Sequence, residues 1–163
     1  MNNRISSETM KDLDLAKYMG SWYEISKYPM KWEQDCERAA ANYHWDEHNR
    51  KVLVENQCWV GNTLVRTRHA TAWVPDMSDK GKLLIQFDDG LPADPGPSPY
   101  WVHWTDYHDA IVGGPSGKFL WWLSRNPKVN ATDVEPMLKR VKSFGYNPDK
   151  LMAAPSAVIK PSR

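Results

Sequence analysis

The chain has 163 residues and a formal net charge of +1, from 21 basic and 20 acidic side chains. This length suits one domain, residues 1–163, that buries its own core without metal or disulfide staples. A charge so close to zero lacks the basic field that draws proteins to phosphate backbones, so no nucleic-acid partner is expected.

The chain contains no run of 18 apolar residues, and its first residues lack the apolar core of a signal peptide. We therefore expect a soluble protein that touches a membrane at most from outside. As the sequence stands it predicts a cytoplasmic protein, whereas removal of a leader would imply a periplasmic or secreted one. Nine Trp and seven Tyr residues suit either a dense core or a ligand cavity.

The N-terminal segment 1–12 is polar and is expected to be flexible, before a short helical turn around Leu15 and Tyr18. The first strand then opens at Gly20 and ends before Pro29. Side chains alternate along a strand, so Trp22 and Glu24 share one face. An unpaired buried carboxylate is costly, and Glu24 is therefore expected to hydrogen-bond or to be protonated.

Seven further strands are predicted from alternating or β-branched segments bounded by turn residues, at 39–45, 51–60, 63–74, 82–87, 100–104, 110–112 and 118–124. Residues 30–37 have no clean period and indicate a long loop. The segment 88–99 carries four prolines, which forbid a helix and deny a sheet its donors, so it is predicted to be a loop throughout.

One long helix is predicted at about 132–144, followed by a C-terminal tail at 154–163. Thr132 and Glu135 match a capping box, in which each side chain satisfies a free backbone donor of the other residue. Pro136 is expected near the first turn, where its missing N–H costs little. Apolar residues at helical spacing predict a buried face.

Eight consecutive strands joined by short turns favour an all-β fold, an eight-stranded antiparallel up-and-down β-barrel over about 20–125 with the C-terminal α-helix packed outside. A two-sheet sandwich is the competing arrangement. In an up-and-down barrel, Trp22, residues 105–107 and residues 124–126 meet at one rim. The loops at 29–38, 61–62, 88–99 and 113–117 meet at the other and form the mouth.

The two cysteines, Cys36 and Cys58, flank the turn near Asn49, so the hairpin register could bring them opposite each other. A disulfide and two buried free thiols are the alternatives, and a disulfide requires an oxidising compartment. The five histidines lack metal-ligand spacing, so neither a metal site nor a cofactor is expected.

Three short motifs occur in order: Gly20-Ser21-Trp22, Thr105-Asp106-Tyr107 and Arg125. Together with the longer stretches 20–25, 41–43, 54–57, 99–101 and 123–127, they resemble the lipocalin family, in its apolipoprotein D and bacterial lipocalin branch. The resemblance implies that Trp22 plugs the base of the barrel beneath Arg125 in a cation–π stack, and that Asp106 is structural. Related bacterial lipocalins often carry a similar cysteine pair, which favours the disulfide.

The resemblance also implies that the barrel holds a ligand against Tyr43, Asn56 and Trp121. Strand alternation adds further inward positions, at Ala41, Val54, Ile85, Phe87, Tyr100, Val102, Trp104 and Phe119. Such a lining suits an amphiphile, because apolar walls favour an acyl chain while a few polar groups orient its head.

The function implied by the resemblance is non-catalytic binding, transport or storage of a small hydrophobic or amphipathic ligand, such as a fatty acid or lysophospholipid. The chain is expected to be a monomer or weak dimer. A chromophore or haem binder and a lipid-modifying enzyme are the alternatives. Neither cysteine has an evident basic partner to activate its thiol, which argues against the enzyme hypothesis.

Overall fold

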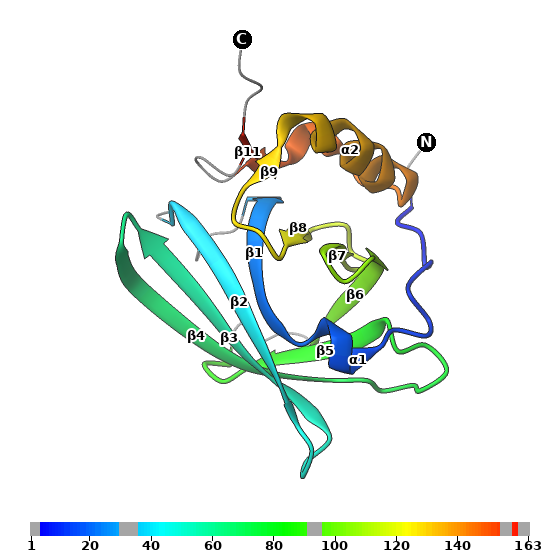
Figure 1. Cartoon of the computed structure of the whole chain (residues 1–163). Coiled ribbons are helices and arrows are strands. Elements are labelled where there is room, and N and C mark those ends of the chain that lie inside the picture. Colours follow the sequence, from blue (N-terminus) through cyan, green and yellow to red (C-terminus); the bar gives the residue numbers. More distant parts are fainter. Residues whose placement is uncertain (1–3, 30–35, 91–95, 154–157, 160–163) are drawn as a thin grey trace.

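The computed structural model describes residues 4–29, 36–90, 96–153 and 158–159 (Figure 1). Its elements, in chain order, are α1 (Leu15–Tyr18), β1 (Gly20–Lys27), β2 (Arg38–Asp46), β3 (Lys51–Val60), β4 (Thr63–Trp73), β5 (Lys82–Phe87), β6 (Ser98–Thr105), β7 (Asp109–Gly113), β8 (Leu120–Ser124), β9 (Val129–Asn130), the 3-10 turn η2 (Ala131–Asp133), α2 (Val134–Ser143), the 3-10 turn η3 (Pro148–Lys150), β10 (Met152–Ala153) and β11 (Val158–Ile159).

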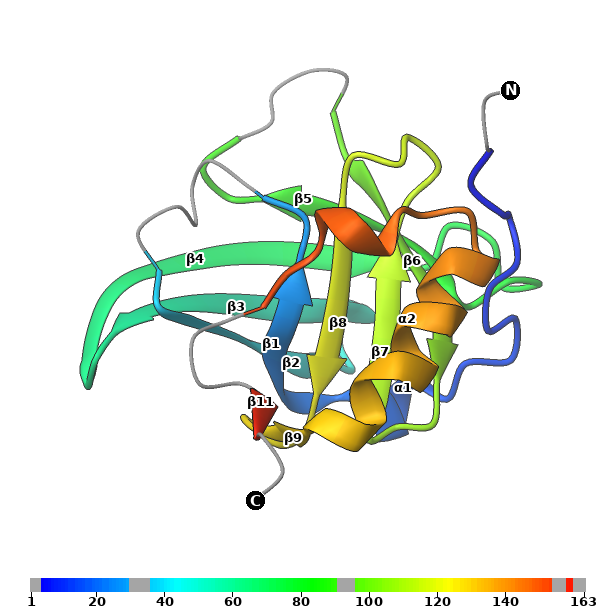
Figure 2. The same cartoon turned by 90° about the horizontal axis from the view of Figure 1, so that it is seen from above.

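The strands β1 to β8 pair antiparallel in chain order, and β8 pairs back onto β1, so the sheet closes into a ring. The predicted barrel with one outer C-terminal helix is therefore confirmed, and the sandwich alternative is wrong. β10 pairs with the C-terminal end of β1, where Ser26 and Lys27 lie opposite Ala153 and Met152. Figure 2 shows α1 at one end of the barrel and the turn between β7 and β8 at the other.

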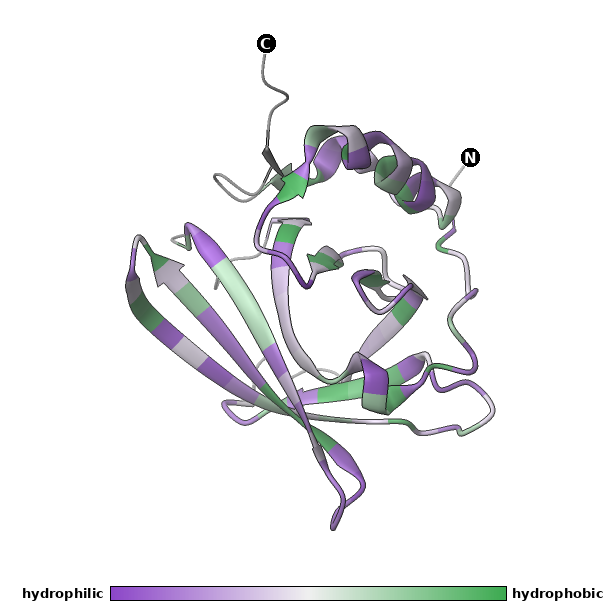
Figure 3. Ribbon diagram, in the orientation of Figure 1, coloured by the Kyte–Doolittle hydropathy of each residue, from purple (hydrophilic) through white to green (hydrophobic). Residues whose placement is uncertain are grey.

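Alternation along the strands divides the apolar residues between two cores, and Figure 3 shows the alternating hydropathy along β3 and β4. One core fills the closed end of the barrel, around Leu13, Trp22 and Val102. The other lies between the outside of the barrel and α2, where Ile25 and Ile111 pack with Val141. Burial of the apolar face of α2 thus fixes the helix to the barrel wall.

The helix begins differently from the capping-box prediction. α2 starts at Val134 after the 3-10 turn, and neither η2 nor α2 has a side-chain cap at its N-terminus. With Asp133 as the N-cap, the third helical residue is Pro136, whose nitrogen carries no proton for a cap to accept. The extra 3-10 turn therefore replaces the capping box.

The proline-rich segment also differs from its prediction, because β6 begins at Ser98 and includes Pro99. Pro99 lies opposite Leu84 of β5, but the pairing of β6 with β7 starts only at Trp101. Near the start of a strand, where only one edge is paired, a missing backbone N–H is tolerated. The predicted loop residues 30–35 and 91–95 lie outside the described part of the chain.

Within the segment 1–12, for which flexibility is expected, residues 4–12 form hydrogen bonds with the barrel and the end of α2, and residues 1–3 lie outside the described part of the chain. The Ser6 amide donates to Phe144 O at 2.8 Å and the Met10 amide to Val102 O at 3.0 Å. His103 joins both chain ends, with Nδ1 2.7 Å from Glu8 O and Nε2 2.7 Å from the Tyr146 hydroxyl. These hydrogen bonds give the polar segment backbone partners that its composition does not reveal.

Candidate functional site

The closed end of the barrel is held by Arg125, which follows β8. Its guanidinium carbon lies 3.8 Å from the ring centroid of the fully buried Trp22, a cation–π geometry. Nη1 donates to Ser21 O and Nη2 to Lys17 O, both at 2.8 Å, and Nε donates to Tyr107 O at 3.1 Å. One side chain thus joins α1, β1 and the turn between β6 and β7.

Gly20 leaves room for this arrangement. Its φ of +99° is disfavoured for other residues, and a Cβ there would lie 3.3 Å from Arg125 Nη1. The turn at residues 105–107 is fixed by Asp106, whose carboxylate accepts from the amides of His108 at 3.0 Å and Asp109 at 2.8 Å. These contacts bring Trp22, Asp106 and Arg125 together at the closed end of the barrel.

Above this floor, the barrel encloses a cavity of about 830 Å³. Its lining includes most of the expected binding residues, namely Ala41, Tyr43, Val54, Asn56, Ile85, Phe87, Tyr100, Phe119 and Trp121. The Phe119 and Trp121 rings are stacked nearly parallel, with centroids 6.0 Å apart, and both line the cavity. The volume and the largely apolar lining suit one small hydrophobic ligand.

Two of the expected binding residues do not line the cavity. Val102 is fully buried in the core below it. Trp104 lies outside the barrel, where the Arg140 guanidinium of α2 is 4.2 Å from its ring centroid. A β-bulge in β6 shifts the register between Val102 and Trp104. Tyr100 and Val102 face into the barrel, but the extra residue reverses the alternation after Val102, so Trp104 lies on the outer face.

Sequence reasoning missed the charged part of the lining, which includes Arg66, Arg68, Asp89 and Lys118. Arg68 pairs with Asp89 through Nε–Oδ2 at 2.7 Å and Nη2–Oδ1 at 3.0 Å. Its guanidinium also stacks on Phe87, 3.7 Å from the ring centroid. The sequence did contain a signal for the two arginines. Ala70 and Ala72 are small and buried, and because side chains alternate along a strand, Arg66 and Arg68 share their face of β4.

Three tyrosines form a hydroxyl cluster at the closed end of the cavity. The Tyr100 hydroxyl lies 2.7 Å from those of Tyr18 and Tyr43, and all three side chains are buried. Desolvation raises the pKa of each phenol well above its ordinary value. The cluster is therefore neutral and adds hydroxyl groups, but no charge, to this end of the barrel.

Glu24 is the buried carboxyl of the cavity, and its side chain is 8% exposed. Burial raises its pKa to about 7, because the loss of water outweighs the attraction of the Lys27 ammonium, 3.7 Å from Oε1. The pKa of Lys27 is lowered, again mainly by burial. Desolvation thus exceeds the mutual attraction of the pair in both groups.

The parent is expected to lose stability as the pH rises from about 5 to about 8, and the variant Glu24→Gln is expected to lack this loss. The folded pKa near 7 exceeds the ordinary value of 4.5, so folding takes up a proton within this window. The free energy of unfolding of the parent therefore falls as the pH rises, relative to Glu24→Gln. Urea unfolding of both proteins across the window measures the difference, and parallel profiles would contradict the assignment.

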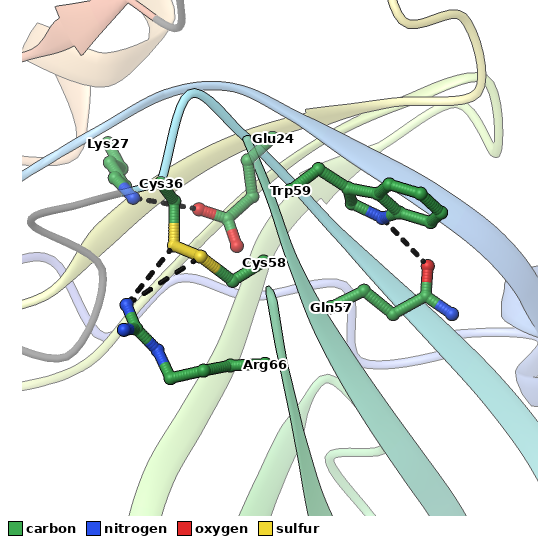
Figure 4. Close-up of a disulfide and its surroundings, with 7 residues drawn as sticks. All are labelled: Glu24, Lys27, Cys36, Gln57, Cys58, Trp59 and Arg66. Carbon is green, nitrogen blue, oxygen red and sulfur yellow. Dashed lines mark hydrogen bonds and ion pairs between the residues drawn. A yellow bond between two sulfur atoms is a disulfide. The ribbon is translucent and has the colours of Figure 1, made fainter. Parts of the chain in front are cut away.

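A disulfide between Cys36 and Cys58 braces the mouth side of the barrel, with its Cα atoms 5.3 Å apart. It joins the segment before β2 to β3, and Arg66 Nη2 lies 3.7 and 3.6 Å from the two sulfurs. Figure 4 shows these contacts together with the Glu24–Lys27 pair. The chain has no free cysteine.

Among the described residues, no group of three or more His, Cys, Asp or Glu side chains lies together in a way that could hold a metal ion. No helix in the described part of the chain has the length and apolar character needed to span a bilayer.

Comparison with known proteins relates this barrel to a family. Residues 13–156 match the family model of a lipocalin-like domain. Temperature-induced lipocalin-1 of Arabidopsis thaliana is 27% identical, over 99% of this chain and 89% of that protein. Apolipoprotein D of Rattus norvegicus is 30% identical, over 75% of this chain and 66% of that protein.

Among solved structures, insecticyanin from the tobacco hornworm Manduca sexta superimposes with a TM-score of 0.67 at 21% identity, covering 98% of this chain and 91% of that one. This likeness concerns the fold, whereas the family match extends over the floor motifs and the cavity strands. The chain therefore belongs to the lipocalin family.

Proposed function

We propose that this chain binds, transports or stores one amphipathic lipid, of the fatty acid or lysophospholipid class, in the barrel cavity. The observation that carries the proposal is the cavity of about 830 Å³, walled by apolar side chains. Each buried CH₂ group of an acyl chain gains about 0.8 kcal/mol on leaving water, so such a wall favours a chain over a compact polar molecule.

The charged lining supports an anionic head group at the mouth. Arg66, Arg68 and Lys118 bring three cationic side chains to the cavity lining, against the carboxylates of Asp89 and Glu24. The two arginines lie on β4 between its cavity-facing alanines and the β3–β4 turn. An acyl chain directed toward Trp22 would place a carboxylate or phosphate near these cations.

Binding is favoured over catalysis by the state of the cysteines. A lipid-modifying enzyme that uses a cysteine needs a thiolate, and both sulfurs are bonded to each other. Disulfides persist in oxidising compartments, so the bridge also favours the periplasmic or secreted location over the cytoplasmic one.

The pocket assignment predicts that Trp121→Ala weakens binding of hexadecanoic acid about tenfold, because a wide apolar wall is lost. The matched control is Trp101→Ala, since Trp101 lies outside the cavity beneath the Lys82 ammonium, 4.7 Å from its ring centroid. Calorimetric titration of the delipidated proteins measures both affinities. Equal affinities in parent and Trp121→Ala would refute the assignment, and so would an equal loss in both variants.

A further inference from the structure

The hydroxyl cluster of Tyr18, Tyr43 and Tyr100 has one more O–H donor than the number of hydrogen bonds within it. Three phenols carry three O–H donors, but only two hydroxyl pairs lie within hydrogen-bond distance, Tyr18 with Tyr100 and Tyr43 with Tyr100. Within the described part of the chain, these hydroxyls have no further hydrogen-bond partner. Whichever way the bonds run, one O–H proton remains without an acceptor.

This cluster lies at the closed end of the cavity. The Tyr18 ring centroid is 5.0 Å from that of Trp22, and Trp22 Nε1 donates to Tyr18 O at 2.8 Å. Tyr43 and Tyr100 line the cavity, whereas Tyr18 lies behind them. In two of the three possible directions of these bonds, the free proton is on Tyr43 or Tyr100, at the end of the cavity that the leading end of a bound acyl chain would reach.

We propose that the bound amphiphile carries an uncharged acceptor oxygen, a hydroxyl or a carbonyl, at its hydrocarbon end, and that Tyr43 or Tyr100, the two tyrosines of the cluster that line the cavity, donates a hydrogen bond to it. The inference rests on the proposed function and specifies its ligand class as lipids oxygenated at the chain terminus. A plain methyl terminus leaves a buried donor unsatisfied, and an unsatisfied buried donor costs more than an average hydrogen bond gains.

The surroundings of the cluster favour an uncharged acceptor over a second carboxylate. Glu24 lies close enough to Tyr43 for its negative charge to contribute to the raised pKa of that phenol. A carboxylate at the same end would meet this repulsion and would lose its hydration. Arg125 stacks its guanidinium on the Trp22 ring and donates to backbone carbonyls such as that of Ser21, and it is not part of the cavity lining.

The test compares hexadecanoic acid with 16-hydroxyhexadecanoic acid on delipidated protein by calorimetry. The measured quantity is the ratio of the Kd of the plain acid to that of the hydroxy acid. We expect a ratio above one in the parent, and a ratio about tenfold lower in the double variant Tyr43→Phe/Tyr100→Phe, which removes both cavity-lining hydroxyls.

The matched control is Tyr18→Phe. It removes one hydroxyl from behind the cavity and leaves the Tyr43–Tyr100 pair with two donors and one bond, so the ratio should stay within about twofold of the parent. A ratio that is unchanged in the double variant, or that falls equally in the control, overturns the inference. If neither acid binds the parent, the proposed function fails together with it.

A second measurement uses the parent alone. Its 8-hydroxyhexadecanoic acid complex should be about tenfold weaker than the 16-hydroxy complex, because a mid-chain hydroxyl enters a largely apolar part of the cavity and leaves the tyrosine donor unsatisfied. Equal affinities for the two isomers, with normal binding of hexadecanoic acid, would overturn the inference and leave the proposed function standing.

Discussion

Replacing Arg125 with alanine is expected to lower the free energy of unfolding by about 3 kcal/mol while leaving the affinity for hexadecanoic acid within about twofold. The change removes the guanidinium stacked on Trp22 and leaves the carbonyls of Ser21, Lys17 and Tyr107 without their shared donor. Because the site is partly exposed, water can hydrogen-bond to the carbonyls that lose the guanidinium. The expected loss of stability is therefore smaller than for three fully buried charged hydrogen bonds.

Arg125→Lys is the matched control, since it keeps the charge but cannot direct a planar fork at three carbonyls. Its stability should fall between those of the parent and the alanine variant. Urea unfolding measures stability and calorimetry measures affinity. If Arg125→Ala unfolds with the parent's midpoint, the floor does not depend on this residue, and a large loss of affinity would mean that Arg125 contributes to binding.

Replacing Ala41 with tryptophan is expected to weaken hexadecanoic acid binding by about 100-fold, with little loss of stability. Ala41 lines the cavity on β2, between Trp22 of β1 and Asn56 of β3. An indole at this position would occupy space that the acyl chain needs, and the open cavity reduces the clash that overpacking usually brings.

The control for this variant is Asn42→Trp, the same substitution on the adjacent, exposed position of β2. Because successive side chains point to opposite faces of the sheet, this indole should lie outside the barrel and leave the affinity unchanged. A parent-like affinity in Ala41→Trp, in a variant with parent-like circular dichroism, would show that the ligand does not enter the cavity.

Strand alternation and turn residues predicted the strands of the barrel from the sequence, although they left a two-sheet sandwich as the alternative. The third strand was predicted at residues 51–60 and the fifth at 82–87, the observed bounds of β3 and β5. Within uninterrupted strands, alternation also predicted Ala41, Val54 and Ile85 to face inward, and all three line the cavity. These predictions succeed because a half-buried strand has a period of two wherever its pairing is regular.

The same rule fails where the pairing is irregular. Nothing local in the sequence Val102-His103-Trp104 marks a bulge, and the partners of His103 at the bulge, Glu8 and Tyr146, are distant in the sequence. The capping box fails for a related reason, since Pro136 changes which donors the first turn offers. Both features depend on interactions that a residue-by-residue pattern does not contain.

The charged lining could not be predicted because an inward arginine contradicts the expected apolar face. Arg68 is accommodated by two partners from other segments, the Asp89 carboxylate and the Phe87 ring. Likewise, the hydroxyl cluster brings together residues of α1, β2 and β6. Sequence identified Tyr43 and Tyr100 as inward residues, but their shared hydrogen bonds exist only in the folded barrel.

The most direct test of a lipid-binding cavity is native mass spectrometry of the protein purified from its own source. We expect a complex heavier than the chain by one amphiphile, whose fragments contain an acyl chain, and loss of this complex in Ala41→Trp. Detection of the chain alone, or of the same adduct in Ala41→Trp, would contradict the proposal that the cavity holds a lipid.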